Sequence, residues 1–210
     1  MKARFGEQIP GATVRLAALL FFAGCVALPV LLPEPQVTSL LSVPPEKTII
    51  VGRIELHPPL QEKEQVLKTW RGKEFRDVFI LYAGDRLRDF KTSKPSTFEG
   101  SYSIPLGKEF FIKAGKGMTF IISGGMFYTE YDPPYRVVPQ TFSSPLQVEL
   151  RPDDEAVYIG TIQYYRDEAN QVKAVMIRDD YQWAESQFKE QFGGSKTLRK
   201  ALLAPVPRAK

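Results

Sequence analysis

Cysteine and histidine are nearly absent from this chain of 210 residues, which contains one of each, Cys25 and His57. A single cysteine excludes an internal disulfide, so packing alone must hold the fold together. A catalytic thiol needs a base, usually histidine, to form its thiolate. His57 precedes two prolines at an expected strand end, where a cysteine sequestered in an apolar segment could not meet it. We therefore expect no catalytic role for Cys25, and the two residues cannot build a His/Cys zinc site.

Familiar catalytic and cofactor motifs are also missing. The chain has no Gly-x-Ser-x-Gly elbow, no phosphate-binding loop and no complete dinucleotide glycine pattern. Acidic residues are plentiful, and the pairs Asp153-Asp154 and Asp179-Asp180 leave a carboxylate mechanism open. The simpler interpretation places the first pair in a turn and the second at a helix cap. We expect a non-catalytic protein without metal or cofactor, with a carboxylate-dependent hydrolase of envelope polymers as the alternative.

Basic residues outnumber acidic ones in this chain, and the excess lies at its two ends. The formal net charge is +4, and the segment after Gly194 carries no acidic residue beside its basic ones, Lys196, Arg199, Lys200, Arg208 and Lys210. A nucleic-acid-binding domain spreads basic charge over its folded face. We therefore expect no nucleic-acid partner and treat residues 195–210 as a basic tail.

The only long apolar stretch lies near the N-terminus, after three basic residues and one acid. Residues 16–24 are uncharged and mostly aliphatic or aromatic, which is typical of an export signal. The tetrapeptide at the end of this stretch, Phe22-Ala23-Gly24-Cys25, resembles the lipobox of bacterial lipoproteins. That resemblance implies a signal peptide over residues 1–24 and a diacylglyceryl anchor on Cys25. Val26 is not the aspartate that retains lipoproteins at the inner membrane, so the family analogy favours the outer membrane.

The same stretch also permits an uncleaved membrane helix. Residues 16–32 form an apolar run of 17 residues, which is at the short limit for a spanning helix. The basic residues before it would then stay in the cytoplasm, and the protein would be a single-pass inner-membrane subunit of an envelope complex. Both alternatives place the rest of the chain on the periplasmic side of a bacterial membrane.

Beyond the anchor, residues 25–46 are rich in proline and predict an extended tether. Residues 47–194 suit one domain of ordinary size. Short runs of Val, Ile, Phe and Tyr between Gly, Pro, Asp and Asn predict a mainly β fold, a β-sandwich or barrel. The expected strands cover residues 48–56, 77–83, 100–104, 109–114, 118–123, 126–131, 146–151, 156–166 and 172–177.

A C-terminal amphipathic helix is expected near residues 180–192. Its apolar residues Tyr181, Ala184, Phe188 and Phe192 recur at steps of three and four, and Gly193 and Gly194 follow. The apolar stripe should lie on the sheet. The tail then predicts a short second helix through Leu202, because prolines follow at positions 205 and 207.

One stretch, "FEGSYSIPLGKEFFIKA" at residues 98–114, resembles the central hairpin of transthyretin-like and carboxypeptidase-regulatory-like β-sandwich domains. In those domains a Pro-x-Gly turn joins one strand pair, and here Pro105-Leu106-Gly107-Lys108 would form the turn. The resemblance implies a non-catalytic accessory or adhesion-type module of the kind that envelope lipoproteins carry.

The most suggestive binding feature is "GGMFYTEYDPPYRVVP" at residues 124–139, where aromatic residues crowd around a turn. Alternation would place Phe127 on one face of a strand and Tyr128 on the other. With Tyr131 and Tyr135, these residues could stack on a glycan or bind an envelope protein. The alternative is that they cover the end of the sandwich core. Together the sequence predicts a membrane-anchored lipoprotein that binds or scaffolds in the cell envelope.

We expect the N-terminal peptide of the protein purified from membranes to begin at Cys25 and to carry lipid. Intact mass spectrometry of that peptide measures this directly. An unprocessed N-terminus with unmodified Cys25 would contradict the lipid anchor and support the spanning helix instead.

Overall fold

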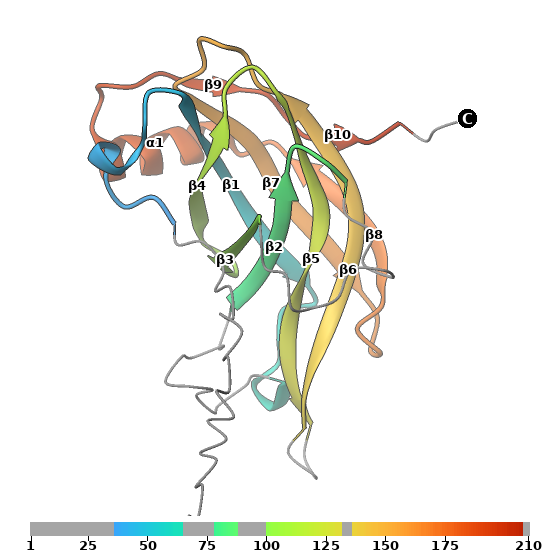
Figure 1. Ribbon diagram of the computed structural model, residues 1–210. Helices are drawn as coiled ribbons and strands as arrows, with labels where there is room; N and C mark the ends of the chain where they lie inside the picture. Colours follow the sequence, from blue (N-terminus) through green and yellow to red (C-terminus); the bar gives the residue numbers. More distant parts are fainter. Residues whose placement is uncertain (1–35, 65–77, 88–99, 132–135, 208–210) are drawn as a thin grey trace, which may run out of the picture.

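Two β-sheets pack face to face and form a sandwich, so the predicted mainly β fold is confirmed (Figure 1). The computed structural model describes residues 36–64, 78–87, 100–131 and 136–207. Besides the strands it contains one α-helix, α1 (Tyr181–Phe192), and two short 3-10 helices, η1 (Leu40–Ser42) and η2 (Glu62–Glu64). No helix among these residues is long and apolar enough to cross a membrane, and the predicted anchor at residues 16–32 lies outside them.

Each sheet has five strands. The first sheet runs in the order β4 (Glu109–Gly115), β1 (Lys47–His57), β7 (Ala156–Arg166) and β8 (Val172–Arg178), and β9 (Leu198–Lys200) also pairs with β7. The second runs β10 (Ala204–Pro205), β6 (Arg136–Glu149), β5 (Thr119–Tyr131), β2 (Val78–Gly84) and β3 (Ser101–Pro105). β1 and β7 run parallel to each other, and β9 runs parallel to β7.

The main core lies between the two sheets and is centred on aromatic rings. The centre of the Tyr164 ring on β7 lies 5.6 Å from the centre of the Phe79 ring and 5.2 Å from that of the Phe142 ring, both on the second sheet. Phe127 packs edge-on against Phe142 at 5.2 Å. All four side chains are essentially inaccessible to solvent. Rings at these separations add favourable contacts to the burial of a large apolar area, so they hold the sheets together.

One long strand replaces two predicted ones. Residues 118–123 and 126–131 were expected as separate strands, but they form the single strand β5, which continues through Gly124 and Gly125. A methyl group at Gly125 would collide with the ring of Phe79. Gly125 therefore serves the close approach of β5 to β2, and the two glycines do not end the strand. Its partner β6 is also longer than expected, because it begins at Arg136.

The helix confirms its predicted apolar stripe. Ala184, Phe188 and Phe192 are buried against the outer face of the first sheet, where they meet Ile49, Val51, Ala156 and Tyr158. Val37 joins this cluster, and its backbone N–H donates to Phe111 O at 2.7 Å. The segment from residue 36 onward therefore packs against β4 and is not the free tether that its prolines predict.

The predicted hairpin at residues 100–114 differs from the structure. Its turn is present, and Gly107 adopts the positive φ of 69° that glycine tolerates. However, β3 pairs with β2 in the second sheet, whereas β4 pairs with β1 in the first. The turn thus carries the chain from one sheet to the other, and the strands it joins do not pair.

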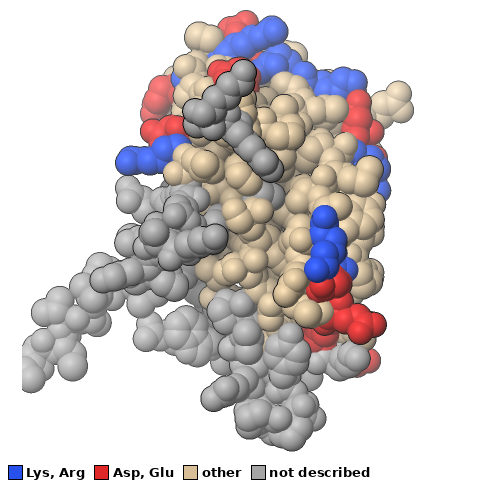
Figure 2. All heavy atoms as spheres, turned by 90° about the vertical axis from the view of Figure 1, so that its right-hand side faces the viewer, with Lys and Arg blue, Asp and Glu red and all other residues tan. Residues whose placement is uncertain are grey.

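The short helix predicted through Leu202 is wrong. Residues 198–200 and 204–205 form strands β9 and β10, which join different sheets. Between them the backbone N–H groups of Ala201 and Leu203 donate to the carbonyls of Tyr158 and Ile159. These long-range backbone bonds outweigh the local helical propensity of the tail. Figure 2 shows the flank that lies on the right of Figure 1, where uncharged side chains cover most of the centre and charged side chains lie along the upper edge and at the lower right.

Replacing Phe188 by alanine should lower the free energy of unfolding by about 3–5 kcal/mol, because Phe188 is 1% exposed and its loss leaves a cavity under α1. Chemical denaturation measures the loss. The matched control is Gln182→Ala on the exposed side of the same helix, which should change stability by less than about 0.5 kcal/mol. Equal effects of the two substitutions would contradict the packing of α1.

Candidate functional site

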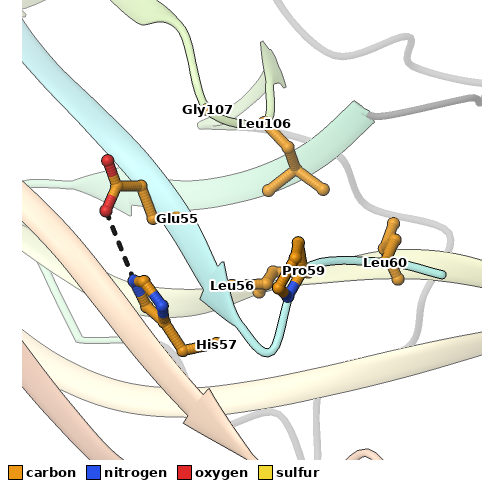
Figure 3. Close-up of a pocket in the computed structure, with 7 residues that line it drawn as sticks. All are labelled: Glu55, Leu56, His57, Pro59, Leu60, Leu106 and Gly107. Atoms are coloured by element: carbon orange, nitrogen blue, oxygen red, sulfur yellow. Dashed lines mark hydrogen bonds and ion pairs between the residues drawn. The ribbon is translucent and has the colours of Figure 1, made fainter.

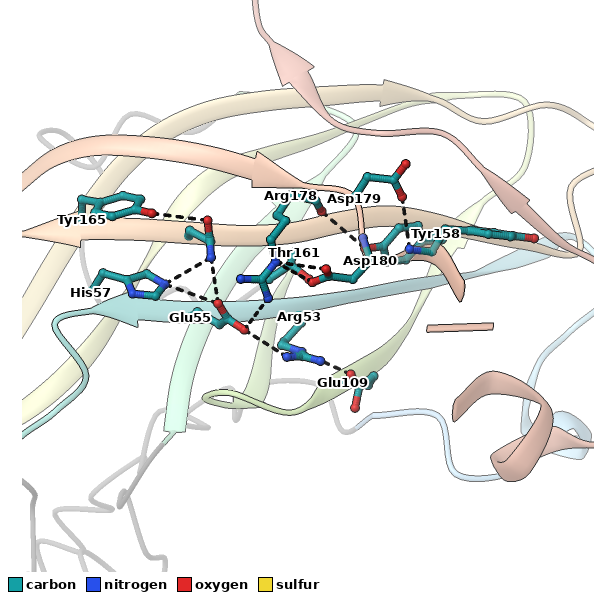
Figure 4. Close-up of polar contacts among 12 residues, drawn as sticks. Arg53, Glu55, His57, Glu109, Tyr158, Thr161, Tyr165, Arg178, Asp179 and Asp180 are labelled. Carbon is teal, nitrogen blue, oxygen red and sulfur yellow. Dashed lines mark hydrogen bonds and ion pairs between the residues drawn. The ribbon is translucent and has the colours of Figure 1, made fainter. Parts of the chain in front are cut away.

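The outer face of the first sheet is divided into two halves. Helix α1 covers one half, and the other half carries a row of polar side chains from β1, β7, β8, the start of β4 and the residues just after β8 (Figure 4). We call this second half the polar row; its members are Arg53, Glu55, His57, Glu109, Thr161, Gln163, Tyr165, Arg178 and Asp180. Because the neighbouring residues in each strand point into the core, the polar row stands on a rigid, well-packed base.

Strand register brings the row together. The parallel pairing of β1 with β7 sets Arg53 beside Thr161, Glu55 beside Gln163 and His57 beside Tyr165. Side chains two apart in a strand share a face. The intervening residues, Ile54, Leu56, Ile162 and Tyr164, all belong to the core. Each polar side chain is therefore aimed outward by the burial of its apolar neighbours.

Glu55 is the centre of the row. Its Oε1 accepts hydrogen bonds from Arg53 Nη1 and Arg178 Nη2, both at 3.0 Å. Its Oε2 accepts one from Gln163 Nε2 at 3.0 Å and lies 3.3 Å from His57 Nε2. Burial raises the pKa of Glu55, but the hydrogen bond from Gln163 and the charges of Arg178 and Arg53 outweigh it, so the pKa lies below its ordinary value.

Arg53 links the centre of the row to helix α1. Its Nε donates to Glu109 Oε1 at 3.2 Å, and its guanidinium carbon lies 3.5 Å from the centre of the Trp183 ring. Such a cation–π contact favours a fixed position for both groups. Burial raises the pKa of Glu109 above its ordinary value in spite of Arg53.

Arg178 and Asp180 form the end of the row nearest the helix. Arg178 Nε donates to Asp180 Oδ2 at 2.8 Å, and Thr161 Oγ1 donates to the same oxygen at 2.9 Å. The Asp180 backbone N–H donates to the Tyr158 hydroxyl at 2.8 Å. Although burial raises the pKa of Asp180, the hydrogen bonds from Arg178 and Thr161 lower it further than burial raises it.

The opposite end of the row carries an aromatic pair. The His57 and Tyr165 rings stack at 4.9 Å with 19° between their planes. Beside them an open hollow of about 510 Å³ is lined by Glu55, His57 and an apolar group, Leu56, Pro59, Leu60, Leu106 and Gly107 (Figure 3). A second open hollow of about 500 Å³ lies at the helix end, where Trp183, Asp180 and Lys200 line it.

The loop that walls the first hollow is held by Arg166, which is buried. Its guanidinium donates to Pro58 O at 3.0 Å and to Pro59 O at 2.9 Å. It also forms two hydrogen bonds with Glu64, at 2.7 and 2.9 Å, and one with Asn170. The hydrogen bonds from Arg166 lower the pKa of Glu64. Since this buried cation is fully hydrogen-bonded, the wall of the hollow is a fixed structure.

The four carboxylates considered from the sequence do not converge on one site. Asp153 is exposed in the turn between β6 and β7. Asp154 is buried there and pairs with Arg199 at 2.6 Å, while Asp179 pairs with Lys200 at 2.9 Å. The pKa of Asp154 is lowered, because the hydrogen bonds and charge of Arg199 outweigh its burial. The hydrogen bond from Lys200 lowers the pKa of Asp179.

The aromatic residues considered from the sequence separate as alternation predicts. Phe127 is fully buried in the main core and so offers no surface to a partner. Tyr128 is half-buried on the opposite face of β5, beside Ile80, Tyr82 and Met126. The side chain of Tyr131 and all of Tyr135 lie outside the described residues, as does Cys25.

Sequence reasoning missed the polar row. The alternation was visible, since "GRIELH" and "TIQYYR" place polar residues at every second position. Such alternation indicates that one face of each strand points away from the core. It does not tell which strands lie side by side. No cluster of three or more metal-ligating residues occurs in the described part of the chain. No protein family, curated protein or solved structure matches this chain.

Replacing Glu55 by glutamine should destabilise the protein most at neutral pH. The pKa of Glu55 is lower in the folded state, so its carboxylate stabilises the fold fully above its ordinary pKa and loses this effect as the pH falls through the folded value. We therefore expect the difference in unfolding free energy between the wild type and Glu55→Gln to shrink between pH 7 and pH 3. Denaturation at a series of pH values measures it, and a constant difference would contradict the Glu55 network.

Proposed function

We propose that this protein is a non-catalytic binding module of the bacterial cell envelope, anchored to a membrane through a lipid on Cys25. Its partner surface is the polar row on the outer face of the first sheet. The anchor keeps the domain at the membrane, and the sheet face is the surface it presents to the envelope. An anchored scaffold needs a rigid surface and no reaction chemistry, which is what the row offers.

The observation that carries this proposal is a fixed face with an exposed rim, in which the central side chains Thr161 and Gln163 are buried. Arg53, Glu55 and Glu109 are held by several contacts each. Around them, the side chains of Arg178 and His57 are 44% and 37% exposed. Met176, which pairs with Gln163, is 55% exposed. A surface already ordered before binding loses little conformational entropy when a partner arrives.

The ionisation of the carboxylates supports a non-catalytic role. A hydrolase of the carboxylate type needs one acid that stays protonated near neutral pH. Asp154, Asp179 and Asp180 each pair with a cation, and the pKa of each is lowered. The one described carboxylate with a raised pKa, Glu109, is 11% exposed and bonded to Arg53. These carboxylates are thus suited to holding structure.

A photoreactive amino acid at position 176 should crosslink an envelope component in living cells, because this side chain stands exposed on the partner surface. The products are detected as a mass shift of the protein on gels. The matched control is position 141, since Thr141 is exposed on β6 of the other sheet.

Adducts from position 176 that are absent from position 141 would support the proposed surface. Adding Arg178→Ala to the position-176 variant should reduce them. No adduct from position 176, or equal adducts from both positions, would refute the polar row as the partner surface.

A further inference from the structure

Each charged side chain of the arginine and acidic residues in the polar row already contacts an opposite charge. Arg53 contacts Glu55 and Glu109, and Arg178 contacts Glu55 and Asp180. The row thus holds two cations and three acids, each engaged with an opposite charge. The extra acidic side chain would repel a strongly anionic ligand. A strongly cationic ligand would compete with both arginines for their acidic partners. The row therefore suits an uncharged ligand.

The row lies on the face of a sheet, and this position does not match the common ways of binding a peptide. An extended peptide binds by adding a strand to a sheet edge, whereas these side chains stand on the face of the sheet across β1, β7 and β8. An amphipathic helix needs an apolar groove. Here the surface between the two hollows is made of arginine, glutamate and glutamine side chains. A ligand rich in hydroxyl groups fits it better.

Hydrogen-bonding capacity remains at the two exposed ends. Arg178 uses Nε and Nη2 for its acidic partners, and its Nη1 has no partner among the described residues. His57 uses Nε2, and its Nδ1 has none in the same part of the chain. Both side chains are held in place by the contacts they already make. They can bond a hydroxyl group without further ordering.

Aromatic side chains stand near both ends. The Tyr165 ring stacks on His57 at one end, and Trp183, 40% exposed, stacks on Arg53 at the other. Tyrosine and tryptophan rings combine an apolar body with a polar tip, and the C–H face of a sugar ring is apolar in the same way. From Arg53 to His57 the strand advances by about 13 Å. Such a length suits a chain of sugar rings and exceeds a single one.

We propose that the polar row binds a linear, uncharged polysaccharide chain that lies from the hollow at His57 to the hollow at Trp183. This inference rests on the proposed function, because it names the class of ligand for the same surface. The sugar rings would contact Tyr165 and Trp183, and their hydroxyl groups would bond Arg178 and His57.

The test is a fluorescence titration of the full-length protein in detergent. The chain has two tryptophans, so Trp70→Phe leaves Trp183 as the only reporter. Chitohexaose and cellohexaose serve as neutral probes, and heparin serves as an anionic one. We expect at least one neutral hexasaccharide to change Trp183 emission in a saturable way. Raising the salt concentration from about 0.15 to 1 M shortens the Debye screening length from about 8 to 3 Å. It should change the midpoint of the titration less than about twofold.

Variants test the contacts. Tyr165→Ala and Arg178→Ala should each weaken binding about tenfold, whereas Tyr165→Phe keeps the ring and should retain most of the affinity. Thr141→Ala on the other sheet is the control and should bind as the wild type does. Denaturation curves check that each variant is folded, and the Tyr165 pair compares two variants at one position.

The outcomes separate this inference from the proposed function. If no neutral hexasaccharide changes Trp183 emission at millimolar concentration, or if only heparin binds in a salt-dependent way, the polysaccharide inference is wrong. Adducts from position 176 that glycosidases leave intact, and in which mass spectrometry finds peptides of a second protein, would also overturn it while leaving the binding function in place. Loss of every crosslink from that position would overturn both.

Discussion

The parallel pairing of β1 with β7 is the constraint on which the structure depends. It joins residues about a hundred positions apart, and it aligns Arg53, Glu55 and His57 with Thr161, Gln163 and Tyr165. The same pairing turns Tyr164 inward against Phe79 and Phe142. A shift of one residue would exchange the polar row with the core. The aromatic core therefore fixes the register, and the register assembles the site.

Helix α1 shapes the site without lying on it. Its buried stripe covers the apolar half of the outer face and leaves the polar half open. Its first turn carries Trp183 to Arg53, and Asp180, just before the helix, reaches Arg178 and Thr161. The Tyr158 hydroxyl accepts the Asp180 N–H, so a residue under the helix also positions the end of the row. Packing of the helix and geometry of the site are thus coupled.

Two partly buried ion pairs hold the chain segments that leave the sheets. Arg166 and Glu64 bind the loop after β1, and Asp154 and Arg199 bind the β6–β7 turn to β9. Pairs of this kind contribute less net stability than their short distances suggest, because both charges lose water. Their role here is positional, since every donor of Arg166 is directed to a defined acceptor.

The sequence by itself determined the local elements. Alternation predicted most of the strands, and the steps between Tyr181, Ala184, Phe188 and Phe192 predicted the helix, because these patterns reflect neighbours along the chain. Tertiary structure alone decided which strands pair, that β3 and β4 belong to different sheets, and that the tail forms strands. It also decided the site, since the partners of Glu55 come from β7 and β8 as well as β1. Contacts between distant segments depend on how the whole core packs, and no local pattern of residues encodes them.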